Sequence, residues 1–247
     1  MDSNIISKII PYEKNIDQKI KKKKILYYHN LRIISSFAVI IIHVSAIYYY
    51  KFNIKSFNWK AAFYFNGISR FSVPIFFMIS GDLFLKKDFT FKIIYYKYIK
   101  NLFIHYIIWS LIYSIYKTKC SQIHINNIIL LCLKGYYHLW YLKTTIGLYM
   151  IVPFLREIIK KDYLLNPFIS LSILFNFFQI FFLLLLSYSE LYYNLFKHFE
   201  NSLNLNFIKG FIFYYIFGFY INRILIINKY IRIYIYIFGI VSRIGLY

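Results

Sequence analysis

The sequence predicts an all-α fold: a polytopic transmembrane helix bundle of about seven spans with its N-terminus in the cytoplasm. Of the 247 residues, 60% are hydrophobic and 16% are charged. A soluble domain of that composition could not cover its apolar surface. The apolar residues form seven runs of spanning or near-spanning length. Lys and Arg concentrate in alternate segments between these runs.

The chain begins with a polar, basic segment, residues 1–30, whose last part holds the cluster Lys21–Lys24. The apolar runs follow at 31–50, 68–85, 103–117, 137–155, 164–187, 207–221 and 231–247. Two of them, 103–117 and 207–221, are short for a span, so we expect each to extend by a turn into its flanks. The basic start resembles a signal peptide, but the run that follows is too long, so we expect a retained first span.

The orientation follows from the distribution of basic residues. With the N-terminus inside, 17 Lys and Arg residues lie in the inner segments 1–30, 86–102, 156–163 and 222–230, and 7 lie in the outer loops 51–67, 117–136 and 188–206. This bias predicts a cytoplasmic N-terminus in a multi-pass protein of the cell membrane. Arg32 then lies at the cytoplasmic end of the first span, and His43 lies in the outer half of the bilayer.

Arg32 and His43 are both inside the first apolar run. An ionisable side chain inside a membrane span costs several kcal/mol, so each is a candidate functional residue. Eleven helical steps place the two on one helix face, about 16 Å apart along the axis. This pattern suggests a charged anchor near one water boundary and a buried base deeper in the membrane. A snorkelling arginine and a packed histidine are the alternative interpretation.

The net charge of +21 does not indicate a nucleic-acid-binding protein, because the basic residues interrupt apolar runs and form no continuous stripe. Cys120 and Cys132 match no redox or metal motif, and we expect no metal. We interpret the many Asn residues as a bias of composition.

Three motifs in residues 28–155 share their order and spacing with one family. The first is YHNLR at residues 28–32 followed by His43, the second is SRFSVPIFFMISG at residues 69–81, and the third is HLWYL at residues 138–142 followed by GLY at 147–149 and Pro153. Together they resemble the acyltransferase 3 family, in particular its O-acetyltransferase branch without an appended extracellular domain.

The resemblance implies transfer of an acyl group to a hydroxyl of a cell-envelope glycan or lipid-linked sugar at the bacterial cytoplasmic membrane. The donor would be acyl-CoA, with acetyl-CoA expected, and the partners would be the bilayer, this donor and the acceptor. His43 would be the catalytic residue, acting as general base on the acceptor hydroxyl. A covalent acyl-histidine is the competing mechanism.

Four cationic residues are candidates for substrate binding. Arg32 would fork onto CoA phosphates, or it anchors the helix at the inner interface. Arg70 would contact the acceptor or the tetrahedral oxyanion, or it snorkels to the outer headgroups. Lys97 and Lys100 fall where related enzymes carry an Arg-x-x-Arg motif, and at i, i+3 on a helix they would present two cations to CoA phosphates. Lysines at the inner end of a span also follow from topology alone.

Two aromatic candidates lie near the outer end of the fourth run. His138 and Trp140 either line the outer mouth and stack on a sugar ring, or belong to the interfacial aromatic belt. Lys143, inside the same run, needs a partner or a water-filled cavity.

The second run also has structural features. Pro74 is expected to bend its helix, and Ser80 and Gly81 are expected to permit close helix packing. Asp82 can pair with Lys86 at i, i+4.

Other features depart from the family pattern. His29 stands where an Asp is common, three residues before the first-helix Arg. The family usually has more spans, so we interpret residues 31–247 as a membrane acyltransferase domain that is incomplete at its C-terminus. Two alternative functions stay open: a transporter in which the buried cations form an anion pathway, and a catalytically inactive truncated remnant.

Overall fold

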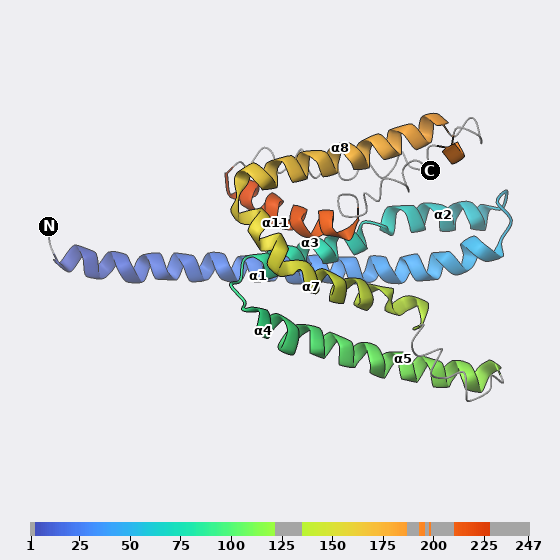
Figure 1. Ribbon diagram of the computed structural model, residues 1–247, viewed down its shortest axis with the longest axis horizontal. Helices are drawn as coiled ribbons and strands as arrows, with labels where there is room; N and C mark the ends of the chain where they lie inside the picture. The colour runs from blue at the N-terminus through green and yellow to red at the C-terminus, as the bar shows by residue number, and fades with distance from the viewer. Residues whose placement is uncertain (1–2, 122–134, 187–192, 196–197, 199–209, 228–247) are drawn as a thin grey trace. The chain divides into compact units, whose positions relative to one another are not determined.

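The computed structural model describes residues 3–121, 135–186, 193–195, 198 and 210–227. Within these residues every regular element is a helix, which confirms the predicted all-α class. In chain order (Figure 1) the elements are α1 (Ser3–Lys51), α2 (Phe57–Ser69), α3 (Ser72–Leu85), α4 (Phe91–Ile93), the π-helical η1 (Ile94–Ile99), α5 (Lys100–Ser121), the 3-10 turn η3 (Tyr137–Leu139), α7 (Trp140–Lys160), α8 (Asp162–Leu186) and α11 (Phe211–Ile227).

Helices occupy most of the described parts of six of the seven predicted runs. The two short runs extend into their flanks as expected, since α5 begins at Lys100 and α11 continues to Ile227. The seventh run, 231–247, lies outside the described residues. Among the described residues, two stretches could cross a membrane by length and composition, Leu26–Lys51 and Phe57–Leu85. Seven spans and a cytoplasmic N-terminus stay predictions.

The structure differs from the sequence prediction at two boundaries. The basic N-terminal segment and the first apolar run share the single helix α1, without a break at residue 30. The predicted outer loop 51–67 contains most of α2. This helix begins because the Ser56 Oγ accepts a hydrogen bond from the Trp59 N–H, at 3.2 Å, and so caps a first-turn donor.

The bend expected at Pro74 takes the form of a break in the helix. The helix is interrupted at residues 70–71, between the end of α2 at Ser69 and the start of α3 at Ser72. Pro74 then lies in the first turn of α3. There its missing N–H costs little, because the N–H groups of a first turn have no partner within the helix.

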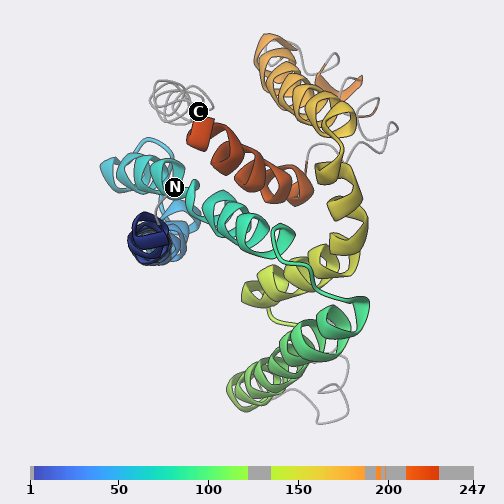
Figure 2. The ribbon, with the colours of Figure 1, turned by 90° about the vertical axis from the view of Figure 1, so that its left-hand side faces the viewer.

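The described chain divides into two compact units, each described here by itself: the first is Met1–Ser80 with Asn222–Tyr247, and the second is Gly81–Ile221. In the first unit α1 and α2 lie side by side (Figure 2) as an antiparallel hairpin. One face of α1, called here the seam face, buries the small residues Ser35, Ala38 and Ser45, at 0%, 5% and 5% exposure. Small side chains allow two helices to approach closely.

In the second unit an aromatic cluster joins the end of α3, the π segment and α7. The ring of Phe84 lies 4.2 Å from that of Tyr149 and 4.7 Å from that of Tyr98, measured between centroids. The Tyr95 hydroxyl donates to the Met150 carbonyl at 3.1 Å. These contacts hold the π segment against α7.

Gly81 of α3 packs directly on the main chain of α11. A Cβ atom at this position would lie 1.8 Å from the Tyr215 carbonyl oxygen and 2.6 Å from its carbon. No side chain larger than hydrogen fits there without moving a helix. The prediction that Gly81 permits close helix packing is confirmed.

Candidate functional site

One face of α1 is hollowed along the stretch that begins at His29. A shallow open cavity of about 260 Å³, called here the α1 hollow, is lined by His29, Arg32, Ile33, Ser36, Phe37 and Ile40. These residues recur with the three- and four-residue spacing of a single helix face. His43 continues the same face by one turn beyond Ile40. Arg32 is exposed and His43 is half-buried.

The α1 hollow has a polar end and an apolar end. His29 and Arg32 lie at the N-terminal end, while Phe37 and Ile40 line it toward His43. The Ser36 hydroxyl donates to the Arg32 carbonyl at 2.8 Å, within the helix. This face can therefore accept an elongated ligand with an anionic end and a less polar body.

The turn of α1 that carries His43 is bonded to α2 through an amide. The Asn66 Nδ2 donates to the Ser45 Oγ at 3.1 Å and to the Ile42 carbonyl at 3.4 Å. The Arg70 Nε in turn donates to the Asn66 Oδ1 at 3.0 Å. Asn66 thereby links Arg70 to the backbone immediately before His43, so two predicted site residues belong to one hydrogen-bonded group of helices.

The other end of the hollow has its own contact. The Asn222 Nδ2 of α11 donates to the Tyr28 hydroxyl at 2.9 Å. Tyr28 is buried, with 9% of its surface exposed, and it directly precedes His29. The first unit thus bonds α1 to a neighbouring helix on each side of the Arg32–His43 stretch.

The remaining predicted site residues belong to the second unit. Lys97 lies in the π segment, with its Nζ 5.9 Å from the centre of the Tyr98 ring, and Lys100 is the first residue of α5. Both side chains are exposed. The i, i+3 argument assumed an α-helix, whereas a π turn closes at i+5. A shared face for the two lysines therefore stays a prediction.

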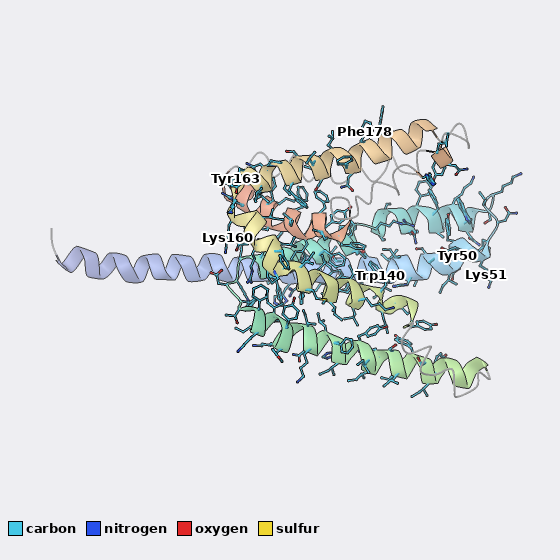
Figure 3. All side chains as sticks on the ribbon, viewed as in Figure 1. Tyr50, Lys51, Trp140, Lys160, Tyr163 and Phe178 are labelled. Carbon is cyan, nitrogen blue, oxygen red and sulfur yellow. The ribbon has the colours of Figure 1, made fainter. Side chains whose placement is uncertain are left out.

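His138 and Trp140 both lie among aromatic side chains. The His138 ring is 5.4 Å from that of Tyr136 and 6.2 Å from that of Tyr113. Trp140 begins α7 (Figure 3), and its ring lies 5.4 Å from that of Phe211. Trp140 keeps 40% of its surface exposed, so one part of the indole can still contact a ligand or lipid.

Lys143 and Asp82 each have a partner of the kind that the sequence suggested. The Lys143 Nζ lies 5.5 Å from the centre of the Tyr106 ring, which is a cation–π contact. Asp82 and Lys86 form the predicted i, i+4 ion pair, in which the Asp82 side chain is 3% exposed and the Lys86 side chain is 34% exposed.

The sequence matches an acyltransferase domain, that of the acyltransferase 3 family, over residues 25–244. The chain belongs to this family. The match includes every predicted site residue, and it makes the protein an acyltransferase of a membrane-associated family. No curated protein and no solved structure matches the chain.

Sequence reasoning missed three residues of this acyltransferase. Asn66 and Asn222 were interpreted as compositional, which is wrong, because their amides join separate helices. Arg156 was counted only as an inner positive charge. No local pattern distinguishes these residues, since Arg156 directly precedes Glu157, α2 also carries Lys60 and α11 also carries Arg223.

Arg156 is buried, with 7% of its surface exposed. Its guanidinium donates to the carbonyls of Phe89 at 2.7 Å, of Phe84 at 3.1 Å and of Lys87. Carbonyls at the end of a helix lack partners within it and carry partial negative charge, so a cation there is favourable. Arg156 therefore fixes the C-terminal end of α3 and the chain that leads to the π segment.

Proposed function

We propose that this acyltransferase moves an acyl group, acetyl in the first instance, from acyl-CoA to a hydroxyl of a cell-envelope glycan or lipid-linked sugar. The observation that carries the proposal is the α1 hollow, which Arg32 lines and which points along the helix face to His43. The family match supports acyl transfer as the reaction class.

The donor is proposed to lie along the α1 hollow. Arg32 holds CoA phosphate oxygens, because a guanidinium forks onto phosphate and keeps its charge. The pantetheine arm follows the apolar side chains toward His43, over a rise of about 16 Å. On the second unit, Lys97 and Lys100 stay proposed contacts for CoA phosphates on the basis of the family resemblance, each acting as a point charge.

His43 is proposed as the general base. Its imidazole removes the proton of the acceptor hydroxyl while that oxygen attacks the thioester carbonyl carbon. The C–S bond then breaks, and the CoA thiolate takes the proton back from the imidazolium, so the products are an O-acyl ester and free CoA thiol. Arg70, held by Asn66, stabilises the developing oxyanion or orients the acceptor.

The acceptor side is proposed to face the outer side of a multi-pass membrane domain whose N-terminus is cytoplasmic. Trp140, with part of its indole exposed, and His138 would stack on a sugar ring there. An acyl-histidine intermediate would place label on the protein itself when labelled acetyl-CoA is supplied without acceptor. A general base predicts no such protein-bound label.

The test measures acetyl-CoA-dependent thiol release together with transfer of labelled acetyl to envelope glycans, in membranes that contain the protein. In Arg32→Ala the KM for acetyl-CoA should rise at least about tenfold, because a hydrogen bond to a charged group contributes roughly 1.5–3 kcal/mol. The kcat should change little. Lys60→Ala, which removes an exposed cation from α2, is the matched control and should behave as wild type. Wild-type membranes that transfer no label would refute the proposal.

A further inference from the structure

The buried and exposed faces of α1 differ in the size of their side chains. The buried side chains in the Arg32–His43 stretch are small, whereas Ile33, Phe37 and Ile40 on the hollow side are 56%, 64% and 58% exposed. Single polar contacts are a known means of fixing the register of two helices. Near the loop to α2 the ring of Tyr49 also stacks on that of Trp59, at 5.3 Å, so the polar contacts that flank Arg32 and His43 are the ones considered for that stretch.

Asn66 makes such a contact at the His43 end. The Ile42 carbonyl accepts from both the Asn66 amide and the Ser45 hydroxyl, at 3.4 Å and 3.1 Å. The Asn66 oxygen accepts from Arg70 at the same time. An amide has both donors and an acceptor, so it can bond to α1 and to a guanidinium together, whereas a carboxylate can only accept.

Asn222 makes the corresponding contact at the Arg32 end. Its amide donates to the hydroxyl of Tyr28, which lies one turn before Arg32 on the helix. Tyr28 is buried, so water can replace the Asn222 amide at its hydroxyl only poorly if this hydrogen bond is removed. The two amide contacts lie on either side of the α1 hollow.

We propose that Asn66 and Asn222 are positioning residues that set the rotation of α1, Asn66 for His43 and Asn222 for Arg32. This inference rests on the proposed function, since it names the residues that orient the catalytic base and the donor-binding cation. It requires the two amides to act on different kinetic constants. Loss of Asn66 misplaces the base and lowers kcat, whereas loss of Asn222 misplaces Arg32 and raises the KM for acetyl-CoA.

The first experiment compares Asn66→Ala and Asn222→Ala at matched membrane levels. We expect about a tenfold lower kcat with an unchanged KM for the first, and about a tenfold higher KM with an unchanged kcat for the second, as for the loss of one buried hydrogen bond. Asn176→Ala is the matched control, because the Asn176 amide donates to the Ser172 carbonyl of its own helix, at 2.6 Å. Both anchor variants behaving as the control, or both changing the same constant, would overturn the proposal.

A rescue variant separates positioning from simple destabilisation. Asn66→Gln keeps an amide, one methylene further from the backbone, and should recover part of the lost kcat, while Asn66→Asp keeps only the acceptor for Arg70 and should not. Equal kcat in the Gln and Asp variants would contradict the role of the amide donor.

The second experiment does not depend on activity. In a chain with Cys120→Ser and Cys132→Ser, single cysteines are placed by Ile40→Cys on the hollow face or by Ala38→Cys on the buried seam face, and are reacted with a small maleimide. The cysteine at 40 should react much faster than the one at 38, and combining Asn66→Ala with Asn222→Ala should reduce this contrast several-fold. An unchanged contrast would overturn the anchoring role. A wild-type chain that transfers no label would refute the proposed function, and the labelling contrast would then decide the anchoring role by itself.

Discussion

Replacement of Gly81 tests a close contact between two helices of the second unit. The added Cβ atom of Gly81→Ala would lie 1.8 Å from the Tyr215 carbonyl oxygen, whereas a carbon and a carbonyl oxygen approach normally to about 3.3 Å. The neighbouring atoms are main chain and cannot rotate away, so α3 and α11 must separate by about 1.5 Å at this point. Overpacking of this kind costs about 3 kcal/mol. The better helix propensity of alanine offsets about 1 kcal/mol of it, so the net destabilisation is about 2 kcal/mol.

Gly147 of α7 is the matched control, because a Cβ atom there meets no atom within 4 Å. Gly147→Ala should stabilise the protein by about 1 kcal/mol through helix propensity alone. The two variants should then differ by about 3 kcal/mol, or roughly 6–12 °C in the midpoint of thermal unfolding for a chain of this size. The assay is thermal unfolding of the detergent-solubilised protein. A midpoint for Gly81→Ala equal to or above that of Gly147→Ala would refute the inferred backbone contact.

Substitutions at three other polar contacts of the second unit are tested by the same thermal midpoint. Arg156→Ala removes the donors to the end of α3 and should cost about 3 kcal/mol or more, with Arg156→Lys recovering only part of it; an unaltered midpoint would show that the guanidinium is dispensable. Lys86→Met removes the ion-pair partner of the buried Asp82 carboxylate and should lower the free energy of unfolding by about 3 kcal/mol. Asp82→Asn should lower it less, because the remaining Lys86 side chain is partly solvated. A larger loss for Asp82→Asn than for Lys86→Met would contradict the burial of Asp82 in this pair. Tyr95→Phe removes the hydrogen bond to Met150 and should cost about 1 kcal/mol or less; a loss several times larger would mean that this hydroxyl does more than join the π segment to α7.

The positions of the helices could be predicted because apolar runs of spanning length have few alternatives to helix in a chain of this composition. The interruption before Pro74 could not be predicted, because a proline in an apolar run is equally compatible with a kink and with the start of a new helix. The π segment at Ile94–Ile99 likewise has no sequence pattern of its own. It depends on contacts such as that of Tyr95 with α7.

The Arg32–His43 face was predictable because both residues lie on one continuous helix, where spacing alone determines the angle between side chains. The contacts of Asn66 and Asn222 with that helix could not be predicted. Asn66 lies 21 residues from Ser45, and Asn222 lies 194 residues from Tyr28. Such pairs depend on how one helix is aligned along another, and the spacing of residues within one helix does not predict that alignment.

The most direct test of the account is the rate of labelled acetyl transfer from acetyl-CoA in His43→Ala compared with His105→Ala, at matched membrane levels. His105 is an exposed histidine of α5 whose Nδ1 lies 2.6 Å from the Asn101 carbonyl oxygen, so it controls for loss of an imidazole. The account predicts that His43→Ala loses roughly a hundred- to ten-thousand-fold in transfer rate, while His105→Ala transfers as wild type does. Transfer by His43→Ala at the wild-type rate would contradict it.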